Sequence, residues 1–335
     1  MKQWMLQFIA DERLPSPHNI ISDDEKDGEI INGKIVSISE PLATPVDILM
    51  GVPVLADKNV IDSDTAKSFG FEWGTHLEGK IEAESRFGYS IEQEIDYFFT
   101  ATQESKESIK GKTILDGGCG PASLTAGIAK LGPKHMVGID INTALFSAYH
   151  HQHSQQNLGI FLCNILDHQL KPESFDLVWS SGVIHHTPDP KAGFEALAKC
   201  VKPEGKLYIW VYGDHFSPIV AVRDVLEIFG LRSWSHGVIM NLSHFFAALT
   251  LPAVWLVQLL AILIPPLGNS ATVRNISDRW GKHGALRMIW FDVLSPKYRY
   301  KYSRSTLKQW FNEAGFEILR EHDYQTGILG QKRKT

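Results

Sequence analysis

Residues 113–132 read TILDGGCGPASLTAGIAKLG, and this stretch decides the fold. A short apolar run ends at Asp116, a glycine loop follows, and apolar residues then recur at spacings of three and four. Pro121 suits the first position of a helix, and Gly132 suits the residue just past its end. The stretch therefore predicts a strand, a tight loop and a helix in succession.

The surrounding residues 109–215 repeat this alternation. Runs typical of strands and of helices follow one another as KTILDGG, PASLTAGIAKLG, HMVGIDI, TALFSAYHHQH, IFLCNIL, FDLVWSSG, KAGFEALAKCV and GKLYIWVYG. Such alternation predicts βαβ units that share a parallel sheet. The fold class is therefore α/β, Rossmann-like, with helices on both faces of the sheet.

The glycine loop indicates the kind of ligand. A dinucleotide-binding loop would carry a third glycine where this chain has Ser123, and the carboxylate of Asp116 would repel a pyrophosphate. A second acid, Asp140, ends the next predicted strand, where acids commonly accept hydrogen bonds from ribose hydroxyls. A ligand with a cationic group, a ribose and no phosphate requirement satisfies both acids, and S-adenosylmethionine is such a ligand.

Three segments carry a family resemblance: ILDGGCGPA, VGIDIN and FDLVWSSGVIHHTPDPKAGFEALAKCVKPEGKLYIW. They resemble the motifs of class I S-adenosylmethionine-dependent methyltransferases of the small-molecule, type 11-like branch. The later stretch QWFNEAGFEIL resembles the last helix and strand of that family. The resemblance implies a seven-stranded, mostly parallel sheet whose last strand is antiparallel.

The resemblance also implies cofactor contacts at particular positions. Asp116, Gly118 and Gly120 match the residues at the methionine part, and Asp140 matches the ribose acid. Ile141 matches the residue that packs on the adenine, and Asn164 stands where many members have an Asp that contacts the adenine amino group. The remaining expected cofactor contacts are Ile165, Ser181 and Trp73.

Methyl transfer is an in-line displacement that needs alignment, exclusion of water and, for a hydroxyl acceptor, a base. His185 and His186 follow the fourth core strand, so each is a candidate base; the alternative is that either one packs or orients a loop. The expected acceptor-pocket residues are Tyr212, Arg223, Asp292 and Tyr298. A surface ion pair is the alternative for Arg223.

Outside the core we expect three further parts. Residues 1–60 are predicted to form a small β-rich module that resembles a zinc ribbon without its cysteines, and therefore without zinc. Residues 61–108 are predicted to be a helical segment over the cofactor. The methyltransferase core is expected to comprise 109–215 and 291–335, with 216–290 as an apolar helical lid insertion.

The insertion contains no Asp, Glu, Lys or Arg between Arg232 and Arg274. Residues 245–264 are long enough to cross a bilayer, but Pro252 and the lack of nearby basic flanks weaken that interpretation. A buried or lid helix over an apolar pocket, an interfacial helix and a membrane-spanning helix all remain open. Peripheral membrane contact through 245–264 would suit a lipid-like acceptor.

Composition excludes several classes. The net charge of −5, without long basic runs, argues against nonspecific nucleic-acid binding. The three cysteines show no metal-like pairing and indicate a reducing compartment, and the N-terminus lacks a secretory pattern, so a cytoplasmic protein is expected. His150, His151 and His153 lie at a predicted helix end without an accompanying acid, so no metal is expected.

The sequence thus predicts a methyltransferase that acts on a small-molecule or lipid-like acceptor. Oxygen, nitrogen and carbon acceptors are all compatible with the fold. A nicotinamide-dependent oxidoreductase is disfavoured by the missing G-x-G-x-x-G pattern. The remaining alternative is a non-catalytic cofactor-binding scaffold at a membrane or partner protein.

Overall fold

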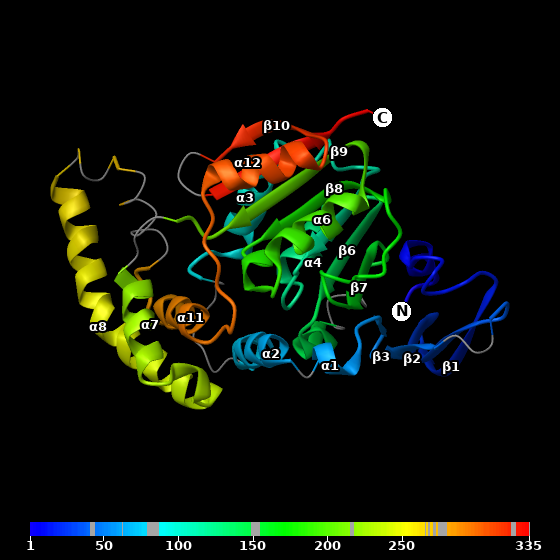
Figure 1. Ribbon diagram of the computed structural model, residues 1–335, viewed down its shortest axis with the longest axis horizontal. Coiled ribbons are helices and arrows are strands. Elements are labelled where there is room, and N and C mark those ends of the chain that lie inside the picture. Colours follow the sequence, from blue (N-terminus) through cyan, green and yellow to red (C-terminus); the bar gives the residue numbers. More distant parts are fainter. Residues whose placement is uncertain are drawn as a thin grey trace. The chain divides into compact units, whose positions relative to one another are not determined.

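The computed structural model divides into two compact units (Figure 1). The first comprises Met1–Lys67, Tyr97–Gly213 and Tyr298–Thr335, and the second comprises Ser68–Asp96 and Asp214–Lys297. The structure describes residues 1–40, 44–61, 63–78, 87–148, 155–214, 218–264, 266, 269–270, 273, 280–322 and 326–334.

The first unit is built on one sheet with the strand order β1-β2-β3-β4-β7-β6-β5-β8-β9-β11-β10. Every pair of neighbouring strands among β5 to β9 is parallel. Strand β11 runs antiparallel to both β9 and β10. The predicted seven core strands, with an antiparallel last strand, are present as part of this eleven-stranded sheet. These core strands are β5 (Thr113–Gly117), β6 (His135–Asp140), β7 (Leu158–Leu162), β8 (Phe175–Ser181), β9 (Val201–Val211), β10 (Phe316–Glu321) and β11 (Thr326–Lys332).

Four N-terminal strands extend this sheet beyond β7. They form an antiparallel meander, and β4 joins β7 in parallel through the pair Val54 and Leu162. The strands are β1 (His18–Lys26), β2 (Glu29–Ser37), β3 (Val46–Leu49) and β4 (Val52–Val54). The β-rich N-terminal segment is therefore an edge of the main sheet.

The short 3-10 helix η1 (Gln3–Phe8) packs on the sheet ahead of this meander. The Trp4 ring stacks on His135 with centroids 4.2 Å apart, and Phe8 stacks on Phe175 at 5.1 Å. Met5 is fully buried. The first residues of the chain are thus part of the core.

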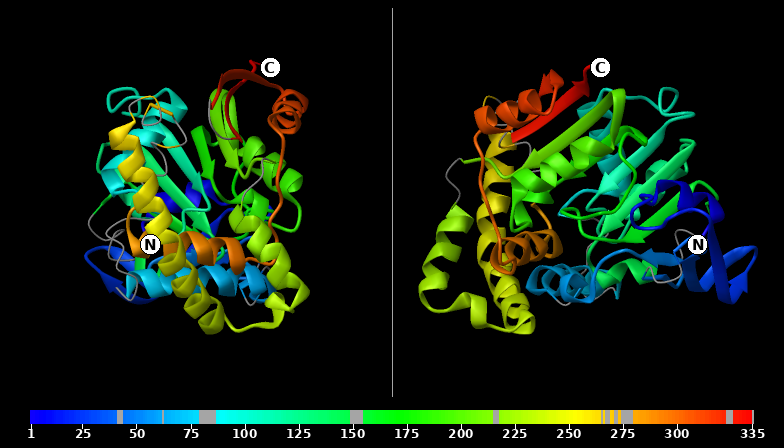
Figure 2. Two further views of the ribbon diagram at one scale, coloured as in Figure 1. Left: turned by 90° about the vertical axis from the view of Figure 1, so that its left-hand side faces the viewer. Right: turned by 45° about the vertical axis from the view of Figure 1, so that its right-hand side comes forward.

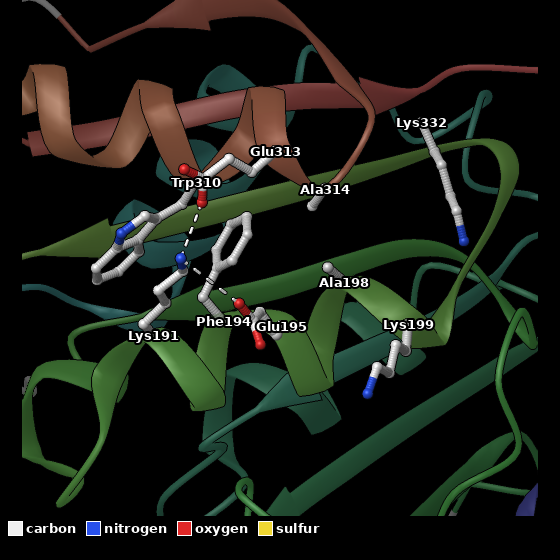
Figure 3. Close-up of a pocket in the computed structure, with 9 residues that line it drawn as sticks. All are labelled: Lys191, Phe194, Glu195, Ala198, Lys199, Trp310, Glu313, Ala314 and Lys332. Atoms are coloured by element: carbon white, nitrogen blue, oxygen red, sulfur yellow. Dashed lines mark ion pairs between the residues drawn. The ribbon is translucent and has the colours of Figure 1, made fainter.

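The helices of the first unit bury apolar faces against the sheet. In α6 (Pro190–Cys200), Asp189 caps the N-terminus by accepting from the Ala192 amide, and Phe194 lies against Trp310 and Phe311 of α12 (Arg304–Glu313). Figure 3 shows α6 and α12 side by side. The other helices with residues in this unit are α1 (Lys58–Ile61), α2 (Asp64–Leu77), α3 (Ile91–Thr102), α4 (Ser123–Ala129), η2 (Thr143–Ala148) and η3 (Ile184–His186).

The second unit is helical and is dominated by a 28-residue helix, α8 (His236–Leu263), drawn as the long yellow-green helix in Figure 2. The Phe246 ring stacks on Trp290 of α11 (His283–Leu294) at 4.6 Å, and Trp290 Nε1 donates to Thr250 Oγ1. The unit also contains α7 (Pro218–Ile228), η4 (Leu231–Ser233) and the greater parts of α2 and its loop to α3.

Most of the apolar surface of α8 is exposed. Its side chains Ile239, Ser243 and Ala247 are buried, but its most apolar window, with mean hydropathy 2.2, is only 11% buried. By length and composition α8 could cross a membrane. Pro252 lies inside it, and the helix continues through that residue.

Candidate functional site

The glycine loop after β5 is tied to the end of β6 by backbone hydrogen bonds. The amides of Gly118 and Cys119 both donate to Ile139 O, at 2.8 and 3.0 Å. The amide of Gly120 donates to Asp140 Oδ2 at 2.8 Å. Because β5 and β6 are adjacent and parallel, their carboxyl ends bring the loop and both acids to one edge of the sheet.

This loop requires residues without side chains. Gly118 has a φ of +89° and Gly120 a φ of +55°, which is the left-handed region that favours glycine. A Cβ added to Gly118 would lie 2.3 Å from Val183 Cγ1. Ala122 takes the helix N-cap position with a φ of 59°, which is also in the left-handed region.

The two acids have different surroundings. Asp116 is buried and accepts a hydrogen bond from Thr125 Oγ1 at 2.7 Å. Asp140 accepts from the Asn142 backbone amide at 3.1 Å and from Asn142 Nδ2 at 2.6 Å. Burial raises the pKa of Asp140, and the hydrogen bonds from Asn142 and Gly120 oppose that rise.

The other residues expected at the cofactor stand at or just after the carboxyl ends of β6, β7 and β8. Ile141 directly follows β6, and Ser181 is the last residue of β8. Asn164 follows β7, and its Oδ1 accepts from the Leu166 amide at 3.1 Å. Ile165 is buried in the main hydrophobic core.

The chemistry of this edge fits S-adenosylmethionine. The carboxylate of Asp116 suits an ammonium group, and Asp140 supplies acceptor oxygens for ribose hydroxyls. The glycines leave backbone exposed where a ligand must approach closely. These residues would hold the cofactor, and the group would supply an electrophilic methyl on a sulfonium.

A second cluster lies at the ends of β8 and β9, where His185 and Tyr212 are in ring contact at 4.1 Å. The segment 298–302 runs along these ends. The amide of Tyr300 donates to His185 O at 3.0 Å, and that of Tyr302 donates to Tyr212 O at 2.9 Å. The predicted residues of this cluster are therefore brought together.

The two histidines differ in their chemistry. His186 Nδ1 lies 2.9 Å from Tyr298 O, and because a carbonyl only accepts, Nδ1 carries the proton and the lone pair of the neutral ring is on Nε2. His185 is fully buried, and burial first, then the charges of His186 and Arg299, hold its pKa well below the usual value. His186 is thus the better placed of the two to accept a proton.

The remaining predicted residues belong to the second unit. Trp73 is buried on α2 and meets Phe87 edge to face at 5.9 Å. Arg223 is buried, pairs with Glu227 at 2.9 Å and donates to Pro296 O at 3.2 Å. Asp292 is buried on α11.

Two residues with unusual surroundings, Glu72 and Arg299, were not predicted from the sequence. Glu72 is fully buried, and neither of its oxygens has a hydrogen-bond partner among the residues that the structure describes; burial and the charge of Asp292 raise its pKa well above the usual value. Arg299 stacks over the Tyr212 ring at 4.5 Å. The alternation of Tyr with Lys and Arg in KYRYKY is a signal that could have drawn attention to Arg299.

A separate open crevice lies between α6 and α12 (Figure 3). Lys191 is held there by Glu313 at 2.9 Å and Glu195 at 3.9 Å. The crevice lining includes none of the residues predicted for cofactor or acceptor. Within the described parts of the chain, no group of three or more His, Cys, Asp or Glu side chains could hold a metal ion, and His150, His151 and His153 lie outside those parts.

Comparison with known proteins agrees with this site. Residues 115–209 match the family model described as a methyltransferase domain. The chain is 31% identical over 137 residues to the ubiquinone biosynthesis O-methyltransferase of Hydrogenovibrio crunogenus. The aligned region covers 39% of this chain and 56% of that protein. The chain's identity to the Coxiella burnetii protein of the same name is 30% over 115 residues, covering 34% and 49%.

Among solved structures, the chain is similar to magnesium protoporphyrin IX methyltransferase from Synechocystis PCC 6803, with 12% identity, a TM-score of 0.45, and coverage of 82% of this chain and 100% of that one. This chain spans about half the length of the curated relatives it matches. The part of the chain that contains the glycine loop, residues 115–209, thus matches a methyltransferase domain.

Proposed function

We propose that the protein transfers a methyl group from S-adenosylmethionine to a small-molecule acceptor of lipid-like character. The observation that carries the proposal is the pairing of the glycine loop with Asp140, because it joins exposed backbone and an acceptor carboxylate at the carboxyl edge of a parallel sheet. The curated relatives are named as O-methyltransferases of ubiquinone biosynthesis, which favours a hydroxyl oxygen as the acceptor atom.

His186 is proposed as the base. Its Nδ1–H is committed to Tyr298 O, so Nε2 can take the hydroxyl proton while the acceptor oxygen forms its bond to the methyl carbon and the carbon–sulfur bond breaks. The products are the methyl ether, the neutral thioether and a protonated imidazole, which returns its proton to solvent. His185 has a pKa held well below the usual value, which suits packing rather than proton transfer.

Peripheral membrane contact through residues 245–264 is part of the proposal. Phe245, Leu249, Leu256 and Leu263 on α8 are each more than half exposed, and that helix contains no Asp, Glu, Lys or Arg. An exposed apolar patch of this kind is typical of a membrane or partner contact. A cytoplasmic protein placed on a bilayer in this way would meet acceptors that partition into lipid.

The scaffold hypothesis gives a different expectation. A non-catalytic scaffold would keep membrane or partner binding and would show no methyl transfer, even with cofactor bound. Asp116→Ala tests this in the full chain: loss of methyl transfer with vesicle binding retained supports an enzyme. The scaffold hypothesis is supported if wild-type protein binds S-adenosylmethionine but transfers no methyl group to a panel of phenolic and prenylated acceptors.

Calorimetric titration with S-adenosylmethionine and S-adenosylhomocysteine tests the cofactor site first. Wild type is expected to bind both, and Asp140→Ala is expected to weaken binding by about ten-fold or more, since charged hydrogen bonds to the ribose are lost. Asp47→Ala is the matched control, because Asp47 is an exposed aspartate on β3. Equal affinities in wild type and Asp140→Ala would contradict the proposal.

A further inference from the structure

Arg299 is a cation without a counter-ion among the residues that the structure describes. Its guanidinium lies over the Tyr212 ring at 4.5 Å, and its Nε is buried with no hydrogen-bond partner in the described part of the chain. By contrast, the nearby Arg304 donates to His322 O at 2.7 Å. A guanidinium that lies over an aromatic ring can still donate its N–H groups to a ligand.

Two other residues near Tyr212 also have buried nitrogens without a hydrogen-bond partner among the described residues. Trp210 Nε1 is buried, and no described residue accepts its hydrogen bond. Both ring nitrogens of His185, one a donor and one an acceptor in the neutral ring, also have no hydrogen-bond partner among the described residues. The His185 ring centroid lies 6.1 Å from that of Trp210 and 4.1 Å from that of Tyr212. Guanidinium and indole groups can only donate, so the cluster has a surplus of donors. Such a surplus is costly unless acceptor oxygens come from elsewhere.

The position of the cluster matches that of a ligand site. It lies at the carboxyl ends of β8 and β9, and β8 is the direct neighbour of β5, which leads into the glycine loop. In open α/β sheets, ligands bind outside the carboxyl ends of the strands. A group bound to Arg299 would therefore lie at the same edge of the sheet as Asp140.

We infer that Arg299 recognises an anionic group, a carboxylate or a phosphate, on the methyl acceptor. A guanidinium binds two oxygens of such a group at once, which fixes both position and orientation. The inference rests on the proposed function only in naming the anion's carrier as the acceptor; the anion site itself can be tested without methyl transfer. The acceptor would thus combine an anionic end held by Arg299 with a hydroxyl presented to His186.

The test uses the full chain and three small probes: benzoate, phenyl phosphate and the neutral benzamide. Dissociation constants come from ligand-observed NMR titration of wild type, Arg299→Gln, Arg299→Lys and Lys301→Gln. Lys301 is the matched control, because it is an exposed cation two residues away on the same segment. S-adenosylhomocysteine is titrated into the same samples by calorimetry.

Wild type is expected to bind at least one anion about ten-fold more tightly than benzamide, and Arg299→Gln is expected to abolish that preference. Arg299→Lys should keep part of it, and Lys301→Gln should keep all of it. Preference for benzoate identifies a carboxylate acceptor, and preference for phenyl phosphate identifies a phosphorylated one.

The inference is overturned if wild type binds benzamide as well as both anions, or if Lys301→Gln loses as much affinity as Arg299→Gln. The S-adenosylhomocysteine titration separates the two proposals. Cofactor binding without anion preference removes the anion site and leaves the methyltransferase proposal intact. Anion preference without cofactor binding keeps the anion site and contradicts the methyltransferase proposal.

Discussion

Gly118→Ala is the change whose cost the structure defines best. Two terms add: the backbone at φ +89° is strained for any residue with a Cβ, and that Cβ would lie 2.3 and 2.4 Å from the two methyl groups of Val183. The first term costs about 1–2 kcal/mol. The second is an overpacking term of about 1–3 kcal/mol. We expect Gly118→Ala to lower the free energy of unfolding by about 2–5 kcal/mol.

Gly132→Ala separates the two terms. Gly132 has nearly the same backbone, with φ +88°, but no heavy atom lies within 4 Å of its added Cβ. It should therefore show the backbone cost alone. Urea unfolding followed by circular dichroism measures both variants, and the difference between them is the clash with Val183.

A double variant checks the assignment of that clash. Val183→Ala removes both methyl groups, while the Val183 Cβ stays 2.8 Å from the added atom, so Gly118→Ala combined with Val183→Ala should recover part of the steric cost. S-adenosylhomocysteine affinity should follow the same order, because the displaced loop carries the Gly120 amide that meets Asp140. Equal destabilisation by Gly118→Ala and Gly132→Ala would refute the reasoning.

Three further predictions concern other parts of the chain. Glu204 is exposed at φ +63°, so Glu204→Gly should raise the free energy of unfolding by about 1 kcal/mol, while Glu204→Ala, which keeps the strain, should not; urea midpoints decide. Burial of Glu104 would raise its pKa, but hydrogen bonds from two lysines, Lys206 at 2.7 Å among them, more than offset this and lower it. The contribution of ionised Glu104 to the free energy of unfolding is therefore fully present above about pH 4.3 and is lost as the pH falls further. The reasoning is contradicted if the free energy of unfolding of Glu104→Gln falls with decreasing pH as steeply as that of wild type. On α8, Leu256→Asp should change stability by less than about 0.5 kcal/mol yet reduce sedimentation with anionic vesicles, whereas Val254→Asp on the buried face should unfold the helical unit; undiminished vesicle binding by Leu256→Asp would count against membrane contact.

Much of the core could be predicted because its signals are local. The period of apolar residues distinguishes strands from helices, and alternation of the two leads to a parallel sheet. Once the sheet is parallel, Asp116 and Asp140 must meet at one edge, since both stand near the carboxyl ends of neighbouring strands. The strand order therefore brings the glycine loop and Asp140 to the same edge, whereas the hydrogen bond from Gly120 to Asp140 is seen only in the structure.

Other features depend on contacts between distant segments. The strands β1–β4 join the main sheet through the parallel pairing of β4 with β7, and no local pattern encodes which edge a strand joins. The tautomer of His186 is set by Tyr298, 112 residues away in sequence. Arg299 acquires its significance only because the fold lays it on Tyr212.

The apolar helix illustrates the same division. Composition alone determined that residues 245–264 would be apolar on every side, and therefore that they need an apolar environment. Only the tertiary structure decided that α11 covers one face and that side chains such as Leu256 on the other remain exposed. Hydrophobicity is a property of the residues, whereas burial is a property of what packs against them, and for α8 the chain supplies only part of that cover.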